Sequence, residues 1–388
     1  MDISYILNEL GEEREKYFNA VAPPIMQSSN FAFDSVADFR KGLRDEAAGF
    51  LYTRANNPTV KILSQKLAAL DGAEDCLVVN SGAGAIFIAV LANIKSGDHI
   101  VSVAQPYAWA QKLFDVILPR FNVSTTYVDG RNTADIEAAI LPNTAIIYLE
   151  SPNSWSFHLQ DLAAVAALAR SRKILTICDN SYCTPLYQRP IELGIDLSLQ
   201  SATKFIGGHS DVVAGVLCGT RQMISKIFNS EYMNTGMGIS PFNAWLLIRG
   251  LRTLPLRMER TIASTAEVVT FLKTKAGVEK IAYPPGAEFE QRELARRQMS
   301  GGGGLLSFCL RVEGIDQIEL FCNSLQHILM AVSWGGHESL IMPAAATISR
   351  EDFDVNNEAH RRIRLYVGLE EPSYLIEDLQ RGFSAIAG

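Results

Sequence analysis

Short apolar runs alternate with helical patterns between residues 60 and 218, and this alternation constrains the fold more than any other feature. Apolar runs of about four to eight residues are typical of buried strands, whereas the segments between them have the period of amphipathic helices. Such alternation implies right-handed crossovers and a mainly parallel sheet covered on both faces, which is an α/β fold. The predicted strands are residues 76–79, 99–103, 123–127, 145–149, 174–178, 197–199 and 212–218, with helices near 60–70, 82–93, 107–118, 132–140 and 160–171.

The chain divides into three regions by pattern. Residues 1–60 contain many helix breakers and little periodicity, which is typical of an arm or lid. Residues 61–245 form the expected α/β domain, and its last predicted strand follows residue 204 too closely for a helical crossover, so we expect a hairpin there. Residues 246–388 begin with helical pattern, with a long candidate at 260–275, and a glycine run at 301–304 opens a strand at 305–312. We expect this last region to be a smaller α+β domain.

Composition excludes several classes of partner. The chain has 35 basic and 42 acidic residues, and the net charge of −7 is spread along it, so nucleic acid and anionic membranes are poor candidates. Its six cysteines form no CxxC pair and no metal-ligand spacing with histidine, which predicts buried free thiols, a reducing compartment and no metal site. No signal peptide and no apolar run of membrane-spanning length is found. We therefore expect a cytoplasmic protein.

Two residues at the ends of predicted strands could carry chemistry. Lys204 follows the strand at 197–199 among small hydroxyl residues, where desolvation would lower the pKa of its amine and allow it to form an imine. Asp179 ends the strand at 174–178, at the edge where open α/β sheets bind ligands. A surface lysine on a loop and an aspartate acting as a helix N-cap are the structural alternatives. The two residues together carry more weight than either alone.

Small and hydroxyl residues form a candidate anion site. Gly82 and Ala83 lie at a strand-to-helix junction, where exposed amide groups and the helix dipole suit a phosphate. Ser201 and Thr203 could donate further hydrogen bonds to it. Neither a P-loop nor a GxGxxG pattern is present, so a nucleotide is not indicated. Close packing of the helix on the sheet would equally explain the small residues.

Three further positions are weak alone. Tyr107 could stack on a planar heteroaromatic ring, although an ordinary tyrosine is the alternative. Arg364 precedes an apolar strand, where its guanidinium could clamp a carboxylate with two parallel hydrogen bonds, although most arginines form surface pairs. Tyr52 and Arg54 lie on the irregular N-terminal arm, where such a pair is usually structural.

Taken together, these pieces resemble the Cys/Met-metabolism family of pyridoxal-5′-phosphate (PLP) enzymes, which includes the trans-sulfuration enzymes. The resemblance covers nearly the whole chain. Its motifs are Tyr52-Thr53-Arg54, Asp179-Asn180-Ser181-Tyr182, Ser201-Ala202-Thr203-Lys204-Phe205-Ile206-Gly207-Gly208-His209, Arg249-Gly250-Leu251-Arg252 and Gly335-Gly336-His337-Glu338-Ser339-Leu340.

This resemblance implies PLP fold type I, the aspartate aminotransferase-like fold, with a large seven-stranded sheet domain that binds PLP. It also implies a homotetramer, a dimer of dimers, in which the arm of one subunit contributes to its neighbour's site. The family motifs also imply a role for each residue. Lys204 carries PLP as a Schiff base and acts in catalysis with Tyr107, which stacks on the ring, and Asp179 pairs with the pyridine nitrogen. The phosphate is bound by Gly82, Ala83, Ser201 and Thr203 of the same subunit and is reached by Tyr52 and Arg54 of the neighbour, whereas the substrate is surrounded by Ser333, Trp334, Asn153 and Arg364.

The implied activity is cleavage of a carbon–sulfur bond in a small sulfur amino acid such as cystathionine. Trp334 and the segment around it look most like the cystathionine β-lyase subgroup, which predicts β-elimination to pyruvate, ammonia and a thiol. The alternatives are γ-elimination or γ-replacement on the same scaffold, or a non-catalytic protein of this fold. The family commonly has Asn-Pro after Glu-Ser-Pro-x, whereas this chain continues Glu150-Ser151-Pro152-Asn153 with Ser154 and Trp155. Either Asn153, shifted by one residue, or Ser154 would then take the place of the family's Asn. Trp109 and Trp155 also stand near the expected pocket mouth.

Overall fold

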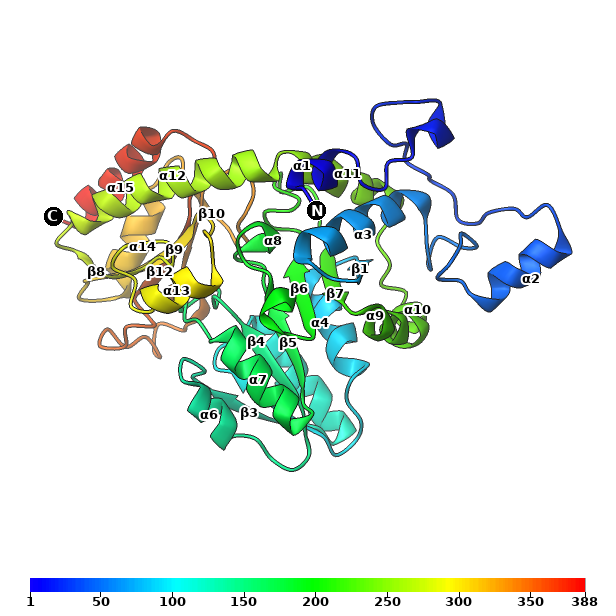
Figure 1. Ribbon diagram of the computed structural model, residues 1–388. Coiled ribbons are helices and arrows are strands. Elements are labelled where there is room, and N and C mark those ends of the chain that lie inside the picture. Colours follow the sequence, from blue (N-terminus) through cyan, green and yellow to red (C-terminus); the bar gives the residue numbers. More distant parts are fainter. Residues whose placement is uncertain (388) are drawn as a thin grey trace.

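The computed structural model describes residues 1–387, in which two sheets lie side by side with helices packed around them (Figure 1). The larger sheet has seven strands in the order β1-β7-β6-β5-β4-β2-β3. The five neighbouring strands β6, β5, β4, β2 and β3 pair in parallel, whereas β7 pairs antiparallel with β6 and β1. The mainly parallel sheet and the hairpin after residue 204 are therefore confirmed. The strands are β1 Asp75–Val79, β2 His99–Val103, β3 Ser124–Val128, β4 Thr144–Glu150, β5 Leu175–Asp179, β6 Leu197–Ser201 and β7 Gly215–Gly219.

Both faces of this sheet are covered because successive side chains of each strand point to opposite faces. In β1, Cys76 and Val78 pack in one core cluster with α3, whereas Leu77 and Val79 pack in another with α4. The helices and short helical turns of this part are α3 Pro58–Asp71, α4 Gly82–Leu91, α5 Ala108–Lys112, η2 Leu113–Ile117, η3 Leu118–Phe121, α6 Thr133–Ala138, α7 Leu162–Arg172, α8 Thr184–Tyr187, η4 Pro190–Leu193, α9 Arg221–Ile227, η5 Phe228–Tyr232, α10 Met233–Thr235 and α11 Pro241–Arg252.

Local capping signals fix where the central helices begin. Asn57 caps α3 by accepting a hydrogen bond from the amide of Thr59, and Pro58 occupies the first turn, where its missing N–H costs nothing. Ser81 caps α4 in the same way, with its Oγ accepting from the amide of Gly84 at 3.0 Å. The amides of Gly82 and Ala83 are consequently left at the start of α4, beside the end of β6.

The second sheet has five strands in the order β10-β11-β12-β9-β8 and lies on the left of Figure 1. Its own core cluster is built from α12, α14, α15 and the strands. The expected helix at 260–275 begins earlier, at Leu254, and Arg364 lies within β12 rather than before it. The elements are α12 Leu254–Lys273, β8 Val278–Ala282, α13 Arg292–Gln298, β9 Leu305–Leu310, α14 Ile315–Asn323, β10 Leu329–Met330, β11 Leu340–Pro343, η6 Ala344–Thr347, β12 Arg362–Tyr366 and α15 Pro372–Ile386.

The first 57 residues run from the body of the molecule outward. α1 (Ile3–Asn8) packs on α3, and the buried Lys66 amine of α3 donates hydrogen bonds to the carbonyls of Ile6 and Leu7 and pairs with Glu12 at 3.1 Å. After η1 (Arg14–Tyr17), the chain extends to the right of Figure 1, where α2 (Val36–Arg44) has no buried residue. The beginning of this region is therefore anchored on the rest of the chain, and so are residues 23–26, which hydrogen-bond to Thr59 and Trp245, whereas α2 buries none of its residues.

All six cysteines are free and buried, as predicted. None of the helices within residues 1–387 combines the length and apolarity that crossing a membrane requires.

Candidate active site

Ten of the thirteen predicted site residues line one cavity of about 390 Å³. The cavity lies at the carboxyl ends of β4, β5 and β6 and at the start of α4, and β12 of the second sheet forms another wall. Parallel strands end on the same edge of a sheet, so residues that are far apart in sequence meet there. The ten residues are Gly82, Ala83, Tyr107, Asp179, Ser201, Thr203, Lys204, Ser333, Trp334 and Arg364.

Lys204 follows β6 directly and points its amine into this cavity, where Nζ donates a hydrogen bond to Ser333 Oγ. Burial and, to a smaller extent, the positive charge of Arg364 lower the pKa of the Lys204 amine to about 8, although the charge of Asp179 opposes them. The Trp334 ring lies 5.4 Å from Nζ and closes one side. An amine with this pKa is partly neutral near pH 8, so it is a better nucleophile and base than an exposed lysine.

Asp179 is the last residue of β5, and its carboxylate accepts a hydrogen bond from the amide of Ser181 at 2.9 Å. Burial raises the pKa of the Asp179 carboxyl, whereas the Ser181 hydrogen bond and the charge of Lys204 lower it. The carboxylate can therefore serve a cationic group placed in the cavity.

Glu150 is a site residue that the sequence analysis missed. It ends β4 one strand away from Asp179, and its two oxygens accept hydrogen bonds from the amides of Tyr107 at 2.6 Å and Ser154 at 2.7 Å. Burial and the charge of Asp179 raise the pKa of the Glu150 carboxyl to about 7, although the hydrogen bonds of Ser154 and Tyr107 lower it. A carboxylate at the end of a buried strand is the same signal that identified Asp179, so it could have been found.

Arg364 projects from the middle of β12 into the cavity. Its guanidinium lies 4.5 Å from the centre of the Trp155 ring, and Nη1 donates to the carbonyl of Ser154 at 3.4 Å. Burial lowers the pKa of Arg364 to about 10, whereas Glu150 and Tyr107 raise it. Within residues 1–387 no carboxylate lies within ion-pair distance of Arg364, so its fork is available to the carboxylate of a ligand.

The remaining cavity residues form a rim around these charges. Tyr107 precedes α5 and is partly exposed, and burial together with Asp179 and Glu150 raises the pKa of its phenol. Gly82 lies so close to Ser201 that an added Cβ would come within 3.0 Å of the Ser201 Cβ. The Thr203 hydroxyl donates to the carbonyl of Ala214 at 3.2 Å, so its proton is engaged within the chain.

Three predicted residues lie outside the cavity. Tyr52 and Arg54 are exposed on the N-terminal region, with the Arg54 guanidinium 5.7 Å from the Tyr52 ring. Asn153 is buried behind the wall, where its Nδ2 donates to the carbonyl of Gln105 at 2.9 Å and its Oδ1 accepts from the amide of Trp155 at 2.9 Å. The Asn153 side chain thus fixes the turn that presents Ser154 and Trp155 to the cavity.

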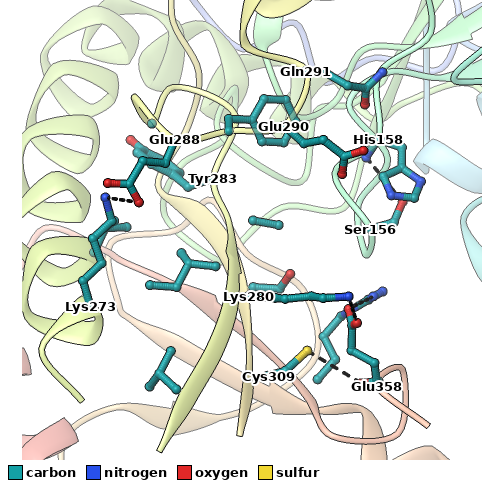
Figure 2. Close-up of a pocket in the computed structure, with 18 of the residues that line it drawn as sticks. Ser156, His158, Lys273, Lys280, Tyr283, Glu288, Glu290, Gln291, Cys309 and Glu358 are labelled. Atoms are coloured by element: carbon teal, nitrogen blue, oxygen red, sulfur yellow. Dashed lines mark hydrogen bonds and ion pairs between the residues drawn. The ribbon is translucent and has the colours of Figure 1, made fainter. Parts of the chain in front are cut away.

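A larger cavity of about 950 Å³ lies between residues 156–158 and the edge of the second sheet (Figure 2). Its charged residues pair with one another: Lys273 lies 2.9 Å from Glu288, and Figure 2 shows Lys280 pointing at Glu358. It contains none of the predicted site residues. Satisfied pairs of this kind leave no charge for a ligand, so the smaller cavity is the candidate active site.

Known proteins resemble this chain over nearly its whole length. The family description "Cys/Met metabolism PLP-dependent enzyme" matches residues 6–384. The L-methionine gamma-lyase of Treponema denticola is 37% identical over 383 residues, covering 97% of this chain and 95% of that enzyme. The O-succinylhomoserine sulfhydrylase of Pseudomonas aeruginosa is 34% identical over 367 residues, covering 93% and 90%. The crystal structure of cystathionine gamma-lyase from Lactobacillus plantarum, complexed with L-serine, superposes with a TM-score of 0.91 at 33% identity and covers 100% of both chains.

These findings confirm the family resemblance and the expected PLP fold type I. The relatives are named γ-lyases and a sulfhydrylase rather than cystathionine β-lyases, so they support the lyase class without the β-lyase subgroup. The residues of the cavity fit PLP. Lys204 offers an amine of lowered pKa, Asp179 offers a buried carboxylate, and the start of α4 against Ser201 forms a cradle in which a side chain at Gly82 would not fit.

Proposed function

Because this chain belongs to the Cys/Met-metabolism family of PLP-dependent enzymes, we propose that it cleaves a carbon–sulfur bond of a sulfur-containing amino acid. One observation carries the proposal: a desolvated amine, a buried carboxylate and a guanidinium without a carboxylate partner share one cavity of about 390 Å³. Such a set can hold a carbonyl cofactor, bind an amino acid by its carboxylate and move a proton.

In this proposal Lys204 would carry PLP as a Schiff base, and Asp179 would pair with the pyridine nitrogen of the ring. The amides of Gly82 and Ala83 and the hydroxyl of Ser201 would hold the phosphate, joined by the Thr203 hydroxyl if its proton turns away from the Ala214 carbonyl. Tyr107 would stack on the ring. Bound PLP supplies an electron sink for the negative charge that forms at Cα when the proton leaves.

The chain's own groups would then perform the remaining steps. Arg364 binds the substrate carboxylate with two parallel hydrogen bonds and so fixes the direction of the Cα–H bond. The Lys204 amine, whose pKa is lowered to about 8 mainly by burial, would remove the Cα proton as a general base. The C–S bond breaks with its electron pair going to sulfur, which leaves as a thiolate, and water completes the conversion of the remaining carbon skeleton to pyruvate and ammonia.

We favour β-elimination as the reaction. Trp334, 5% exposed, is packed edge-on against Phe205 with ring centres 5.4 Å apart, and it lies beside the Lys204 amine. Elimination at Cβ needs one proton removed, at Cα, whereas γ-elimination needs a second one removed at Cβ. The Trp334 ring and the hydrogen bond to Ser333 limit how far the amine can move between these two carbons. The γ-reaction is the second candidate, because the relatives described above carry γ-type names.

The two reactions are separated by their products. Purified holoenzyme incubated with L-cystathionine should release pyruvate and homocysteine if the bond at Cβ is broken, and 2-oxobutyrate and cysteine if the bond at Cγ is broken. L-Methionine, which has no sulfur at Cβ, should release methanethiol only by the γ-reaction. Lys204→Ala should lose the visible absorbance of the bound cofactor and all turnover. Normal turnover in that variant would contradict the assignment of the base, and failure to cleave any thioether would favour a non-catalytic protein.

We further propose that residues 1–60 form an arm that completes the site of a neighbouring subunit in a homotetramer, with residues 61–245 and 246–388 as the two following domains. Support comes from Tyr52 and Arg54, which are exposed and lie outside their own cavity. Arg54→Ala and Lys204→Ala should each be inactive, yet co-expression should restore about a quarter of the activity, because about half of all dimers are mixed and one of the two sites in each mixed dimer is intact. Complementation would fail if each subunit built its own site.

The cytoplasm is the proposed location. The support is six free, buried cysteines in a chain without disulfides among the described residues. Fractionation of cells that make the native protein would test this location directly.

A further inference from the structure

Every charged residue that lines the cavity already has a task at its reacting end. The charged lining residues are Glu150, Asp179, Lys204 and Arg364. Lys204 and Asp179 serve the cofactor, Arg364 faces the substrate carboxylate, and Glu150 is occupied by the amides of Tyr107 and Ser154. No charged side chain that this chain adds to the lining is left for a second charged group at the far end of a substrate, and the Arg54 proposed to come from a neighbouring subunit is assigned to the phosphate.

The rest of the wall is largely apolar and aromatic. Three of the four tryptophans of the chain, Trp109, Trp155 and Trp334, line this single cavity together with Val332 and Met342. Trp155 covers the Arg364 guanidinium, Trp334 lies beside Lys204, and Trp109 is 58% exposed at the rim. Chance does not readily concentrate the rarest large side chain in one small cavity.

The chain holds the backbone of Trp155 and contacts the Trp109 ring before any ligand arrives. Asn153 Oδ1 accepts hydrogen bonds from the amides of Trp155 and Ser156, both at 2.9 Å, and Ser307 Oγ donates to the Trp155 carbonyl at 3.4 Å. The Lys112 amine lies 4.7 Å from the centre of the Trp109 ring and packs against it. Ordered rings lose little freedom on binding, so their surface contributes efficiently to affinity.

We propose that this site selects substrates whose sulfur carries an aromatic, uncharged substituent, such as a benzyl thioether of cysteine. This inference rests on the proposed lyase function. An aromatic group can stack against the indole rings and bury apolar surface there. The ammonium and carboxylate at the far end of cystathionine would instead lose water without finding charged partners in the wall. The thiol released would therefore be an apolar one.

Substrate competition tests the inference separately from the function. With the holoenzyme, S-benzyl-L-cysteine and S-benzyl-L-homocysteine cover β- and γ-cleavage, and kcat/KM for the cleaved one should exceed that for L-cystathionine at least about tenfold. If cystathionine is the better substrate, the inference is wrong while the lyase function stands. If no thioether is cleaved, the proposed function itself fails.

A binding measurement tests the aromatic wall without turnover. α-Methyl-S-benzyl-L-cysteine has no Cα proton, so the holoenzyme can bind it but cannot deprotonate it, and calorimetry gives its Kd. In Trp109→Ala this Kd should rise about tenfold, while the Kd of α-methyl-S-methyl-L-cysteine should change less than about twofold. Phe242→Ala, which removes another half-exposed ring outside the cavity, is the matched control and should leave both values unchanged.

A second variant guards against misfolding of the first. Trp109→Leu keeps an apolar side chain at the rim but removes the ring face, and it should also weaken the benzyl ligand selectively. Equal weakening of the benzyl and methyl ligands in both variants would mean that Trp109 supports the structure rather than specificity. An unchanged Kd for the benzyl ligand in both variants would likewise overturn the inference.

Discussion

Replacing Glu150 with glutamine should remove the loss of stability that the wild-type apoprotein shows as the pH rises from 5 to 8. The same replacement should lower the activity of the holoenzyme. The Glu150 carboxyl has a pKa raised to about 7 by burial and by the charge of Asp179. A raised acid pKa means that the native state binds this proton more tightly than the unfolded chain does. The contribution of Glu150 to the free energy of unfolding is therefore largest below about pH 4.5 and falls as the pH rises towards 7.

The size of this effect follows from the pKa values. A carboxyl pKa raised from 4.5 to about 7 corresponds to about 3 kcal/mol of stability lost on ionisation in the native state. Glutamine has nearly the shape of the protonated acid and never ionises. Between pH 5 and pH 8 the unfolding free energy of the variant should therefore rise by about 3 kcal/mol relative to that of the wild type, on top of a constant difference that does not depend on pH.

The functional cost comes from hydrogen bonding. The amides of Tyr107 and Ser154 bind different oxygens of Glu150, at 2.6 and 2.7 Å. Glutamine offers one oxygen, so one amide would face an NH₂ group and lose its acceptor, which costs about 1–3 kcal/mol. Both loops carry residues that line the cavity, so kcat/KM should fall about tenfold.

Urea unfolding of the apoprotein between pH 5 and 8 measures the stability difference, because bound PLP would add its own charges to the site. Glu150→Asp is the matched control: it keeps an ionisable group and should keep the pH dependence. A difference between wild type and Glu150→Gln that does not change with pH would refute the reasoning.

Three other predictions follow from the same contacts. In the apoprotein, the rate at which an acylating reagent modifies the Lys204 amine should rise with a midpoint near pH 8. The midpoint should lie at lower pH in Asp179→Asn, because that variant lacks the charge that raises the pKa of Lys204. A midpoint typical of an exposed lysine would contradict this. Arg364→Lys should raise KM about tenfold with a smaller change in kcat, because an ammonium cannot form two parallel hydrogen bonds; an unchanged KM would exclude the carboxylate role. Lys66→Met should lower the unfolding free energy by about 3 kcal/mol, because Glu12 and two carbonyls lose a buried partner; equal urea midpoints would count against it.

Part of the active site follows from chain pattern alone. Strand–helix alternation implies a parallel sheet, and parallel strands deliver their last residues to one edge. Lys204 and Asp179 are therefore expected at the same edge of the sheet. In the structure Asp179 ends β5, Lys204 follows the end of the adjacent strand β6, and both line one cavity. Glu150 ends β4 and obeys the same rule, so the same signal at a third strand end predicts it as well.

The sequence by itself determined the class of fold, the pairing of an amine with a carboxylate at a sheet edge, and the family, because these depend on local period and on contiguous motifs. Only the tertiary structure decided which side chains from the second sheet face that edge and what each of them contacts. Arg364 comes from the middle of β12, and its guanidinium meets Trp155 of a distant loop. Asn153 turns away to hold that loop. Such choices depend on how the two sheets pack and on which groups are buried between them, and neither is encoded in a local pattern.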